Sequence, residues 1–107
     1  MAYDQLLADR VRNVLQNEKL TEKDMFDGIG FLWKDTLVCG VQDEFLIVNV
    51  GVDRFKEVLT HPQVRPFRVD GRTMSGCVMV KPLSTAREAD LKGWIQSAMD
   101  FVKSQPN

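Results

Sequence analysis

The amino-acid sequence predicts a single α+β domain, residues 1–107, in which helices cover a mostly antiparallel sheet. Three observations lead to this class: an amphipathic helical pattern at each end of the chain, short apolar runs between them, and links too short for the crossovers that parallel strands need. The expected order is a helix, three or four meandering strands, a short helix, two strands and a long helix. Strands and helices grouped in this way, instead of alternating, are typical of α+β proteins.

The first expected element is an amphipathic helix near the N-terminus. Apolar residues recur at helical spacing and form its buried stripe: Tyr3, Leu7, Val11 and Val14, widened by Leu6 and Leu15. The segment 17–24, "NEKLTEKD", breaks this pattern and leads into extended structure.

Four apolar runs follow, and polar dipeptides separate them. We expect turns at Asp27-Gly28, Lys34-Asp35 and Gln42-Asp43, the first because Asp-Gly is a favoured hairpin dipeptide. The run 45–50 is apolar on both faces except for Asn49, as expected for a central strand that is covered on each side.

A short helix is predicted over 51–59, where Asp53 can cap and Phe55, Val58 and Leu59 form the buried side. Prolines 62 and 66 end it. The runs "FRV" and "CVMV", joined by a turn at Asp70-Gly71, form a last hairpin that Pro82 closes. In the intervening "GRTMSG", Met74 is expected to point to the core, and Gly76 to mark a place where a crossing helix excludes side-chain bulk.

The last helix is predicted to begin with a capping box, because Thr85 and Glu88 have the S/T-x-x-E spacing. Its apolar stripe consists of Leu91, Trp94, Ile95, Ala98, Phe101 and Val102. We interpret Trp94 and Phe101 as core residues and not as a platform for a cofactor.

Charge is distributed unevenly along a chain whose net charge is only −1. Residues 1–60 hold 7 Lys and Arg against 11 Asp and Glu, whereas residues 61–82 hold Arg65, Arg68, Arg72 and Lys81 against Asp70 alone. Such a basic stretch on an acidic body indicates either solvated arginines around a hairpin or a surface for an anionic partner.

Location and redox state follow from what the sequence does not contain. It shows no signal-peptide layout and no apolar run of the roughly 20 residues that a membrane helix needs. Cys39 and Cys77 lie in apolar runs, so we expect buried, reduced thiols in a cytoplasmic protein and no membrane contact.

No catalytic, metal or cofactor site is predicted. The sequence has a single histidine, His61, at the end of the short helix, where a helix C-terminus favours a partly charged imidazole. Cys and His are too few and too scattered for a zinc signature. The motif "GRTMSG" leads into a strand and lacks a following Gly-Lys-Ser, so it does not predict a phosphate loop.

The stretches "KDMFDGIGFLW", "RPFRVDGRTMSGCVMV" and "LKGWIQSAMDFVKSQP" resemble the TfoX/Sxy N-terminal domain family, and the resemblance extends from residue 2 to residue 106. It implies a helix–three strands–helix–two strands–helix fold similar to secretion chaperones. Family members that regulate natural competence act with the cyclic-AMP receptor protein and carry a second domain, which is absent here. The chain resembles the free-standing single-domain members, whose biochemical role is generally unassigned. It departs from the family at Asp27, Asn49 and Ser75.

From these observations the leading hypothesis is a non-enzymatic cytoplasmic binding or regulatory module, linked by the resemblance to transcription or competence regulation. It would contact a protein, or less readily a nucleic acid, through the surface of Arg65, Arg68, Arg72 and Lys81 or through an exposed sheet face. A free strand edge also predicts a homodimer as one option.

Two other hypotheses use the same residues. In the alternative, the chain is a small enzyme or accessory subunit acting on a nucleotide or nucleic acid, with the three arginines on phosphate and His61 moving protons. In the other, Arg72 is structural and pairs with Asp53 or Glu57.

Overall fold

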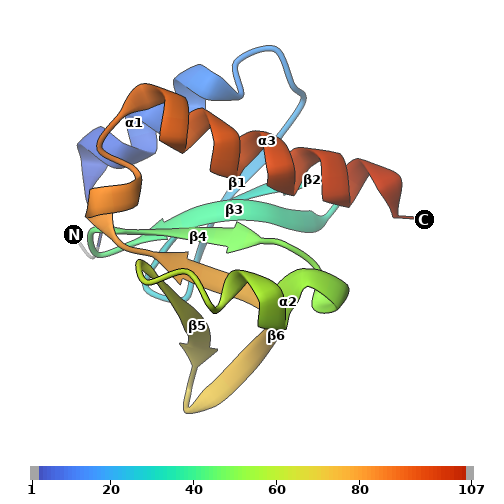
Figure 1. Ribbon diagram of the computed structural model, residues 1–107. Helices are drawn as coiled ribbons and strands as arrows, with labels where there is room; N and C mark the ends of the chain where they lie inside the picture. The colour runs from blue at the N-terminus through green and yellow to red at the C-terminus, as the bar shows by residue number, and fades with distance from the viewer. Residues whose placement is uncertain (1–2, 106–107) are drawn as a thin grey trace.

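The computed structural model describes residues 3–105 and shows an α+β fold with one six-stranded antiparallel sheet and three α-helices (Figure 1). The two ends of the predicted domain, residues 1–2 and 106–107, lie outside the described residues. The elements follow in this order: α1 (Gln5–Val14), β1 (Thr21–Met25), β2 (Gly28–Trp33), β3 (Thr36–Gln42), β4 (Phe45–Asn49), α2 (Val52–Val58), β5 (Val64–Val69), β6 (Arg72–Val80), the short 3₁₀ helix η1 (Pro82–Ser84) and α3 (Glu88–Ser104).

The order of strands across the sheet is β1-β2-β3-β4-β6-β5. Four strands therefore precede the short helix, which is the larger of the two numbers predicted from the sequence, whereas the three strands that the family resemblance implies are one too few. The additional strand is β1, whose first four residues are exposed and whose sequence "TEKDM" has no apolar alternation. Backbone pairing with β2 along its full length holds it in place.

The turns of the meander lie where the strand register places them. Lys34-Asp35 is confirmed as a turn, with φ of 48° and 67°. The turn predicted at Asp27-Gly28 lies one residue earlier, at Phe26-Asp27, because Gly28 already pairs with Met25. The third turn likewise lies at Asp43-Glu44 and not at Gln42-Asp43, since Gln42 pairs with Phe45.

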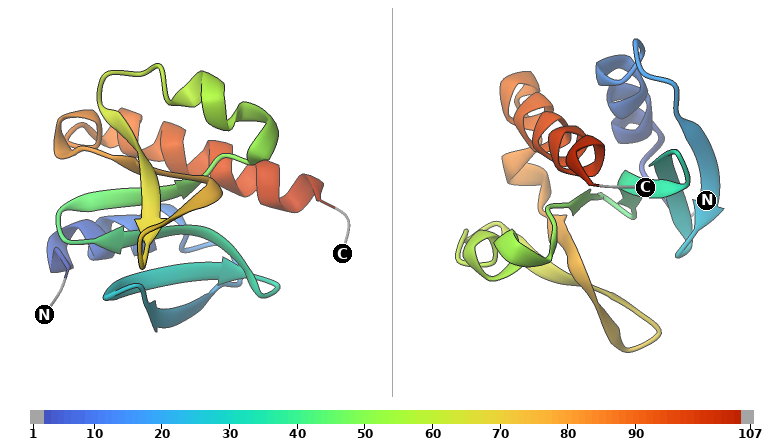
Figure 2. Two further views of the ribbon diagram at one scale, coloured as in Figure 1. Left: turned by 90° about the horizontal axis from the view of Figure 1, so that it is seen from below. Right: turned by 90° about the vertical axis from the view of Figure 1, so that its right-hand side faces the viewer.

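Helices α1 and α3 cover one face of the sheet and enclose the main core with it (Figure 2). The carboxylate of Asp4 caps α1 by accepting hydrogen bonds from the backbone N–H groups of Leu6 and Leu7. Leu7 and Val11 are buried as predicted, but Leu6 is 75% exposed. It lies about 100° around the helix from the buried stripe, so it does not widen that stripe.

The opposite face of the sheet carries a second, smaller apolar cluster around Ile47, Phe67 and Cys77. The Phe26 ring, in the turn between β1 and β2, meets Phe67 of the edge strand β5 edge-to-face, with centroids 5.0 Å apart. An added Cβ at Gly40 of β3 would lie 2.8 Å from the Phe26 ring. Two distant parts of the sheet therefore curl toward each other beneath β3 and β4.

Strand β6 bends in its middle and divides the last hairpin into two parts. Pro66 of β5 lies opposite Val78, yet Arg68 lies opposite Thr73, so the register shifts sharply between them. At the bend, Gly76 has φ of 91°, which favours glycine. The outer part of the hairpin, residues 68–75, therefore projects from the body of the molecule (Figure 1).

This bend settles three predictions about "GRTMSG". Asp70-Gly71 is confirmed as the turn, with φ of 52° and 80°. The exclusion of bulk at Gly76 is also confirmed, and the excluding atoms are backbone atoms of Gly51 and Val52 at the start of α2, 3.3 Å from an added Cβ. The prediction for Met74 was wrong: it is 43% exposed, because it lies in the projecting part that no helix covers.

Neither of the two predicted helix caps forms. Gly51 is the N-cap of α2 and offers no side chain, whereas Asp53 lies inside the first turn, where its charge favours the helix dipole. The capping box of Thr85 and Glu88 is absent because Pro82 begins η1, and the Thr85 hydroxyl donates to the Pro82 carbonyl oxygen at 3.3 Å. Arg87 is the N-cap of α3.

Trp94 and Phe101 are partly buried and pack against the main core, which confirms their predicted contact with it. The Phe101 ring occupies the space beside Gly51, where an added Cβ would lie 2.4 Å from it. Trp94 keeps part of its surface open, and this part borders the cleft described below.

Candidate functional site

The five residues predicted to form a site are spread over the last hairpin and its approach. Arg65 and Arg68 lie on β5, Arg72 begins β6, Lys81 follows β6, and His61 lies in the loop between α2 and β5. Arg72 is the first residue of β6 and Lys81 directly follows its last, so the two stand at opposite ends of the hairpin. The structure therefore does not bring the five together.

The base of the hairpin and its outer part differ in environment. Lys81 is half-buried, and its backbone N–H donates to the carbonyl oxygen of Gln63 at 2.9 Å, which ties the base to the loop before β5. Arg65, Arg68 and Arg72 are all exposed. The fully exposed basic side chains of the hairpin are therefore the three arginines.

The arginines of this chain fall into two groups. Arg10, Arg12 and Arg87 form ion pairs with carboxylates, and Arg54 donates to the Ser97 hydroxyl at 3.1 Å. Within residues 3–105, no side-chain hydrogen bond or ion pair involves any of the three hairpin arginines: Arg65, Arg68 and Arg72. The structural hypothesis for Arg72 was thus wrong, because it is exposed and pairs with neither Asp53 nor Glu57.

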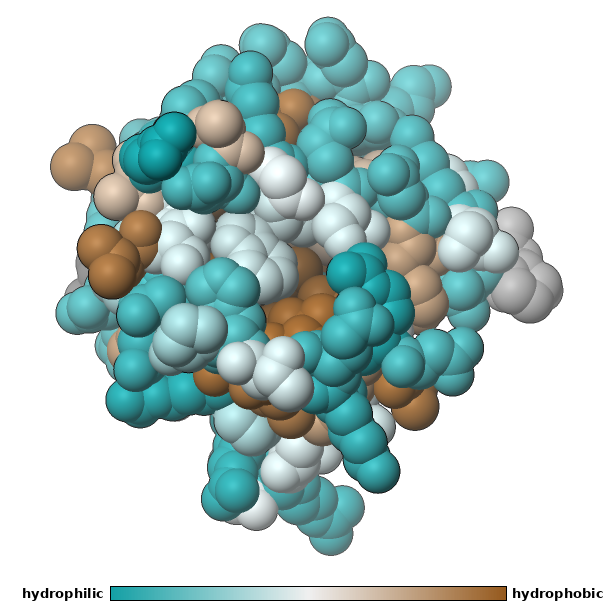
Figure 3. Space-filling model, in the orientation of Figure 1, coloured by the Kyte–Doolittle hydropathy of each residue, from teal (hydrophilic) through white to brown (hydrophobic). Residues whose placement is uncertain are grey.

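A cleft lies between α2 with its following loop and α3 (Figure 3). In the space-filling view, hydrophilic and neutral residues border the hollow, and hydrophobic residues are seen beneath them. Its volume is about 470 Å³, within the range of small-molecule sites. It is lined by Arg54, His61, Ser84, Ala89, Asp90, Gly93, Trp94 and Ser97.

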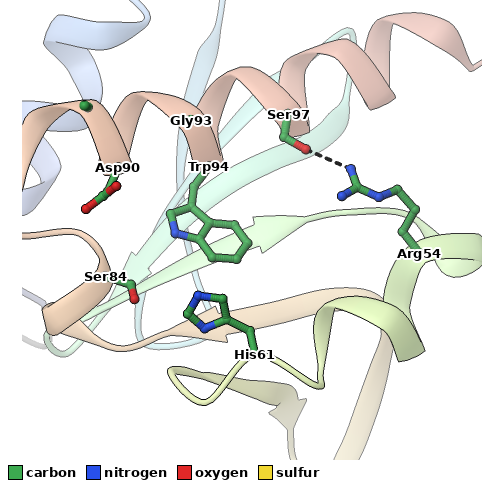
Figure 4. Close-up of a pocket in the computed structure, with 8 residues that line it drawn as sticks. Arg54, His61, Ser84, Asp90, Gly93, Trp94 and Ser97 are labelled. Carbon is green, nitrogen blue, oxygen red and sulfur yellow. Dashed lines mark hydrogen bonds between the residues drawn. The ribbon is translucent and has the colours of Figure 1, made fainter.

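Two aromatic rings meet inside this cleft (Figure 4). His61 and Trp94 pack edge-to-face with their centroids 5.7 Å apart. The Nδ1 atom of His61 accepts a hydrogen bond from the backbone N–H of Gln63 at 3.1 Å. In the neutral ring the hydrogen is therefore on Nε2.

The cleft has the chemistry of a binding site more than that of a catalytic one. Within the described part of the chain, no hydrogen bond joins His61 to a serine or a carboxylate, although Ser84 and Asp90 line the same cleft. Such a bond is one way in which a nucleophile is activated, and the described residues of the cleft do not form it. The lining also includes none of the three hairpin arginines, so the structure does not join His61 to them as the enzyme hypothesis requires.

The two cysteines lie on β3 and β6, with β4 between them. Burial raises the pKa of Cys39 to about 12 and that of Cys77 to about 11, so both thiols stay protonated at neutral pH. No group of three or more His, Cys, Asp and Glu residues in 3–105 is arranged to hold a metal ion.

Sequence reasoning missed Arg54 and Ser97 and assigned Trp94 to the core alone. Arg54 lies 40 positions before Trp94 and 43 before Ser97, and no motif links it to them. The signal that could have been used is Gly93, a glycine inside a strong helical pattern.

None of the helices within residues 3–105 is both long enough and apolar enough to cross a membrane. Comparison with known proteins gave no match of this chain to a family model, to a curated protein or to a solved structure.

Proposed function

We propose that this chain is a non-enzymatic protein-binding module, and that its contact surface is the projecting part of the β5–β6 hairpin with Arg65 beside it. The observation that carries the proposal is the contrast among the arginines. Those on the body bind carboxylates or a hydroxyl of the same chain, whereas Arg65, Arg68 and Arg72 bind nothing within residues 3–105. Guanidinium groups without a partner in the described part of their own chain are suited to bind carboxylates of another chain.

An exposed apolar side chain accompanies these charges. Met74 is 43% exposed on the same hairpin, and methionine adapts its shape to varied partners. Together they suit an acidic segment that also carries apolar residues. Exposed ion pairs contribute roughly 0.2–1 kcal/mol each, and full burial of a methionine contributes about 1.5–3 kcal/mol. The contact is thus expected to be weak and sensitive to salt.

The sheet edge limits how the partner binds. Strand β5 lies at the edge, but Pro66 in its middle has no backbone N–H to donate. An added strand would be interrupted there, so side chains and not backbone pairing carry the proposed contact. A homodimer formed by pairing of β5 edges is therefore a less favoured form of the same proposal.

The resemblance to the TfoX/Sxy N-terminal domain family supports a regulatory role, and with it a cytoplasmic location and a link to transcription or competence. The helix–strands–helix–hairpin–helix order agrees with what that resemblance implies, apart from the additional strand β1. These finer assignments remain part of the proposal. A nucleic acid would bind to the same arginines, and the experiment below distinguishes it from a protein partner.

The test measures binding of a fluorescein-labelled acidic peptide of alternating Glu and Leu by fluorescence anisotropy. Changing Arg65, Arg68 and Arg72 together to Glu should lower its affinity at least about ten-fold, because three favourable charge pairs become repulsive. The matched control changes three exposed lysines elsewhere, Lys19, Lys23 and Lys92, to Glu and alters net charge equally.

Three results would count against the proposal. One is equal loss in the control, which would show that net charge alone attracts the peptide. Another is no loss in the arginine variant while its melting temperature remains that of the wild type. The third is tighter binding of a labelled single-stranded oligonucleotide at equal salt, which would assign the surface to nucleic acid.

A further inference from the structure

We infer that the cleft between α2 and α3 is a binding site for a small aromatic carboxylate, with its ring against Trp94 and His61 and its carboxylate on Arg54. The site draws its residues from three elements: Arg54 comes from α2, His61 from the loop that follows it, and Trp94 from α3 (Figure 4). This inference is independent of the hairpin proposal, because no hairpin arginine lines the cleft.

Gly93 is the first observation, because nothing in the described fold accounts for a glycine at this position. It lies inside α3, where a glycine destabilises a helix relative to alanine. A Cβ added there would have no heavy atom within 4 Å, and φ at this position is not in the left-handed region. Neither packing nor backbone conformation explains the glycine. The space beside it is the cleft, so an occupant of the cleft provides the explanation.

The aromatic part of the ligand follows from the two rings. Trp94 packs against the core with part of its surface and borders the cleft with the rest, while His61 packs edge-to-face on it at 5.7 Å. A neighbouring hollow shares Arg54, His61 and Trp94 and adds the buried side chain of Val58. Rings and an aliphatic side chain around open space favour a flat, apolar group.

The charged part of the ligand follows from Arg54. This side chain donates one hydrogen bond, to Ser97 Oγ, and within residues 3–105 it has no carboxylate partner. A guanidinium carries five N–H donors, so enough remain for a carboxylate bound through both oxygens.

The carboxylates around the cleft select a singly charged anion over a phosphate. Asp90 lines the cleft and Glu57 the neighbouring hollow, so the carboxylates of the two linings outnumber Arg54 by one. A doubly charged phosphate is repelled more strongly than a carboxylate. Asp90 stands seven residues from Ser97, about 10 Å along α3, so it lies away from the end of the cleft that Arg54 occupies.

Fluorescence of Trp94 can report binding directly. The chain has two tryptophans, and Trp33→Phe leaves Trp94 alone. In this background, para-nitrobenzoate should quench the emission saturably. Two analogues should bind several-fold more weakly than para-nitrobenzoate. Para-nitrobenzyl alcohol has no negative charge, and para-nitrophenyl phosphate has a second one. Arg54→Gln should lower the affinity for para-nitrobenzoate about ten-fold, whereas Lys92→Gln, an exposed position on α3 outside the lining, should not change it.

Gly93 separates a binding role from a structural one. Gly93→Ala and Gly93→Leu should raise the melting temperature by several degrees because both residues favour the helix. They should at the same time weaken binding, and leucine should do so more than alanine, because the side chain enters the cleft. Loss of affinity in a protein that has become more stable cannot be attributed to misfolding.

The inference is overturned by quenching that does not saturate, by saturable quenching that Arg54→Gln leaves unchanged, or by full affinity in Gly93→Leu. Tighter binding of the phosphate would overturn the carboxylate assignment. The Arg65, Arg68 and Arg72 triple Glu variant should bind para-nitrobenzoate like the wild type. This result keeps failure of the cleft distinct from failure of the hairpin proposal.

Discussion

Replacing Gly28 by alanine is predicted to destabilise the protein strongly, although the change adds a single methyl group. An alanine Cβ at this position would lie 2.1 Å from the carbonyl oxygen of Val41 and 3.1 Å from its carbonyl carbon. Both contacts are with the backbone of β3, which cannot rotate away as a side chain could. Strands β2 and β3 must therefore separate by about 1 Å near the Ile29–Val41 pair.

The magnitude follows from two contributions. Inserting a methylene-sized group into close-packed surroundings costs about 1–3 kcal/mol. Weakening one backbone hydrogen bond in a buried part of the sheet adds roughly 1 kcal/mol. We therefore expect Gly28→Ala to lower the free energy of unfolding by about 3 kcal/mol, a large share of the roughly 5–15 kcal/mol typical of a whole domain. The corresponding fall in melting temperature is about 12 °C or more.

Two other glycines provide matched controls for the same substitution. Gly71 has φ of 80° and no atom within 4 Å of an added Cβ, so Gly71→Ala incurs backbone strain alone, about 1–2 kcal/mol. Gly93 also has open space but is helical, so Gly93→Ala should stabilise by about 1 kcal/mol. Urea unfolding followed by circular dichroism should rank stability in the order Gly93→Ala, wild type, Gly71→Ala and Gly28→Ala. If Gly28→Ala were as stable as Gly71→Ala, the close approach of β2 to β3 would be refuted.

Three further predictions concern side chains. Arg12→Ala should cost about 1 kcal/mol in urea unfolding, and less at high salt, because its two carboxylate partners on α1 and β1 are largely exposed. The pKa values of Cys39 and Cys77, raised to about 12 and about 11 from 9.0, mean that their contribution to stability is complete below pH 9 and is lost as pH rises toward the folded values. Between pH 7 and pH 10 the free energy of unfolding of the wild type should thus fall by about 1.4 kcal/mol per thiol more than that of a variant with Cys39→Ala and Cys77→Ala. An equal fall in the two proteins would contradict the burial of the thiols. Glu88→Ala should cost under about 1 kcal/mol in the presence of Arg10, its ion-pair partner, and almost nothing in an Arg10→Ala background; a loss that persisted there would indicate that Glu88 caps α3 after all.

The class of the fold could be predicted because periodicity and turn dipeptides report it directly. The exact position of each turn could not, because the strand register decides it. Phe26 illustrates the difficulty: a bulky residue with φ of 43° is disfavoured in a turn. The Phe26 ring is held there because it packs against the Phe67 ring and fits beside Gly40, which has no side chain. Both residues are distant from Phe26 in the sequence. Local propensity favoured Asp27-Gly28, and tertiary packing overrode it.

The extent of strand β1 and the position of Met74 were misjudged for a common physical reason. An apolar pattern predicts a strand only where one face is buried, and β1 is an edge strand held by backbone pairing. Conversely, an apolar residue within a strand predicts burial only where another element covers it. Met74 lies beyond the bend in β6, where nothing does.

The candidate sites were predictable to different degrees. The basic stretch that contains Arg65, Arg68 and Arg72 is visible in the sequence as local charge. Whether those arginines have partners depends on which carboxylates lie near them in space, and no sequence pattern encodes this. The cleft was still harder to predict from the sequence. Arg54 and Trp94 stand 40 positions apart and come together only when α2 packs beside α3.

The bend at Gly76 explains why the hairpin arginines stay unpaired although residues 1–60 are predominantly acidic. Residues 1–60 carry a surplus of four negative charges, enough to neutralise the basic stretch if the hairpin lay flat on the body. The carbonyl oxygen of Gly76 instead accepts hydrogen bonds from the N–H groups of Val50 and Gly51, at 2.8 and 3.2 Å, which fixes the bend against the start of α2. The outer hairpin is thereby directed away from the body. The backbone geometry at Gly76 thus leaves the positive charges of the hairpin arginines exposed for a partner.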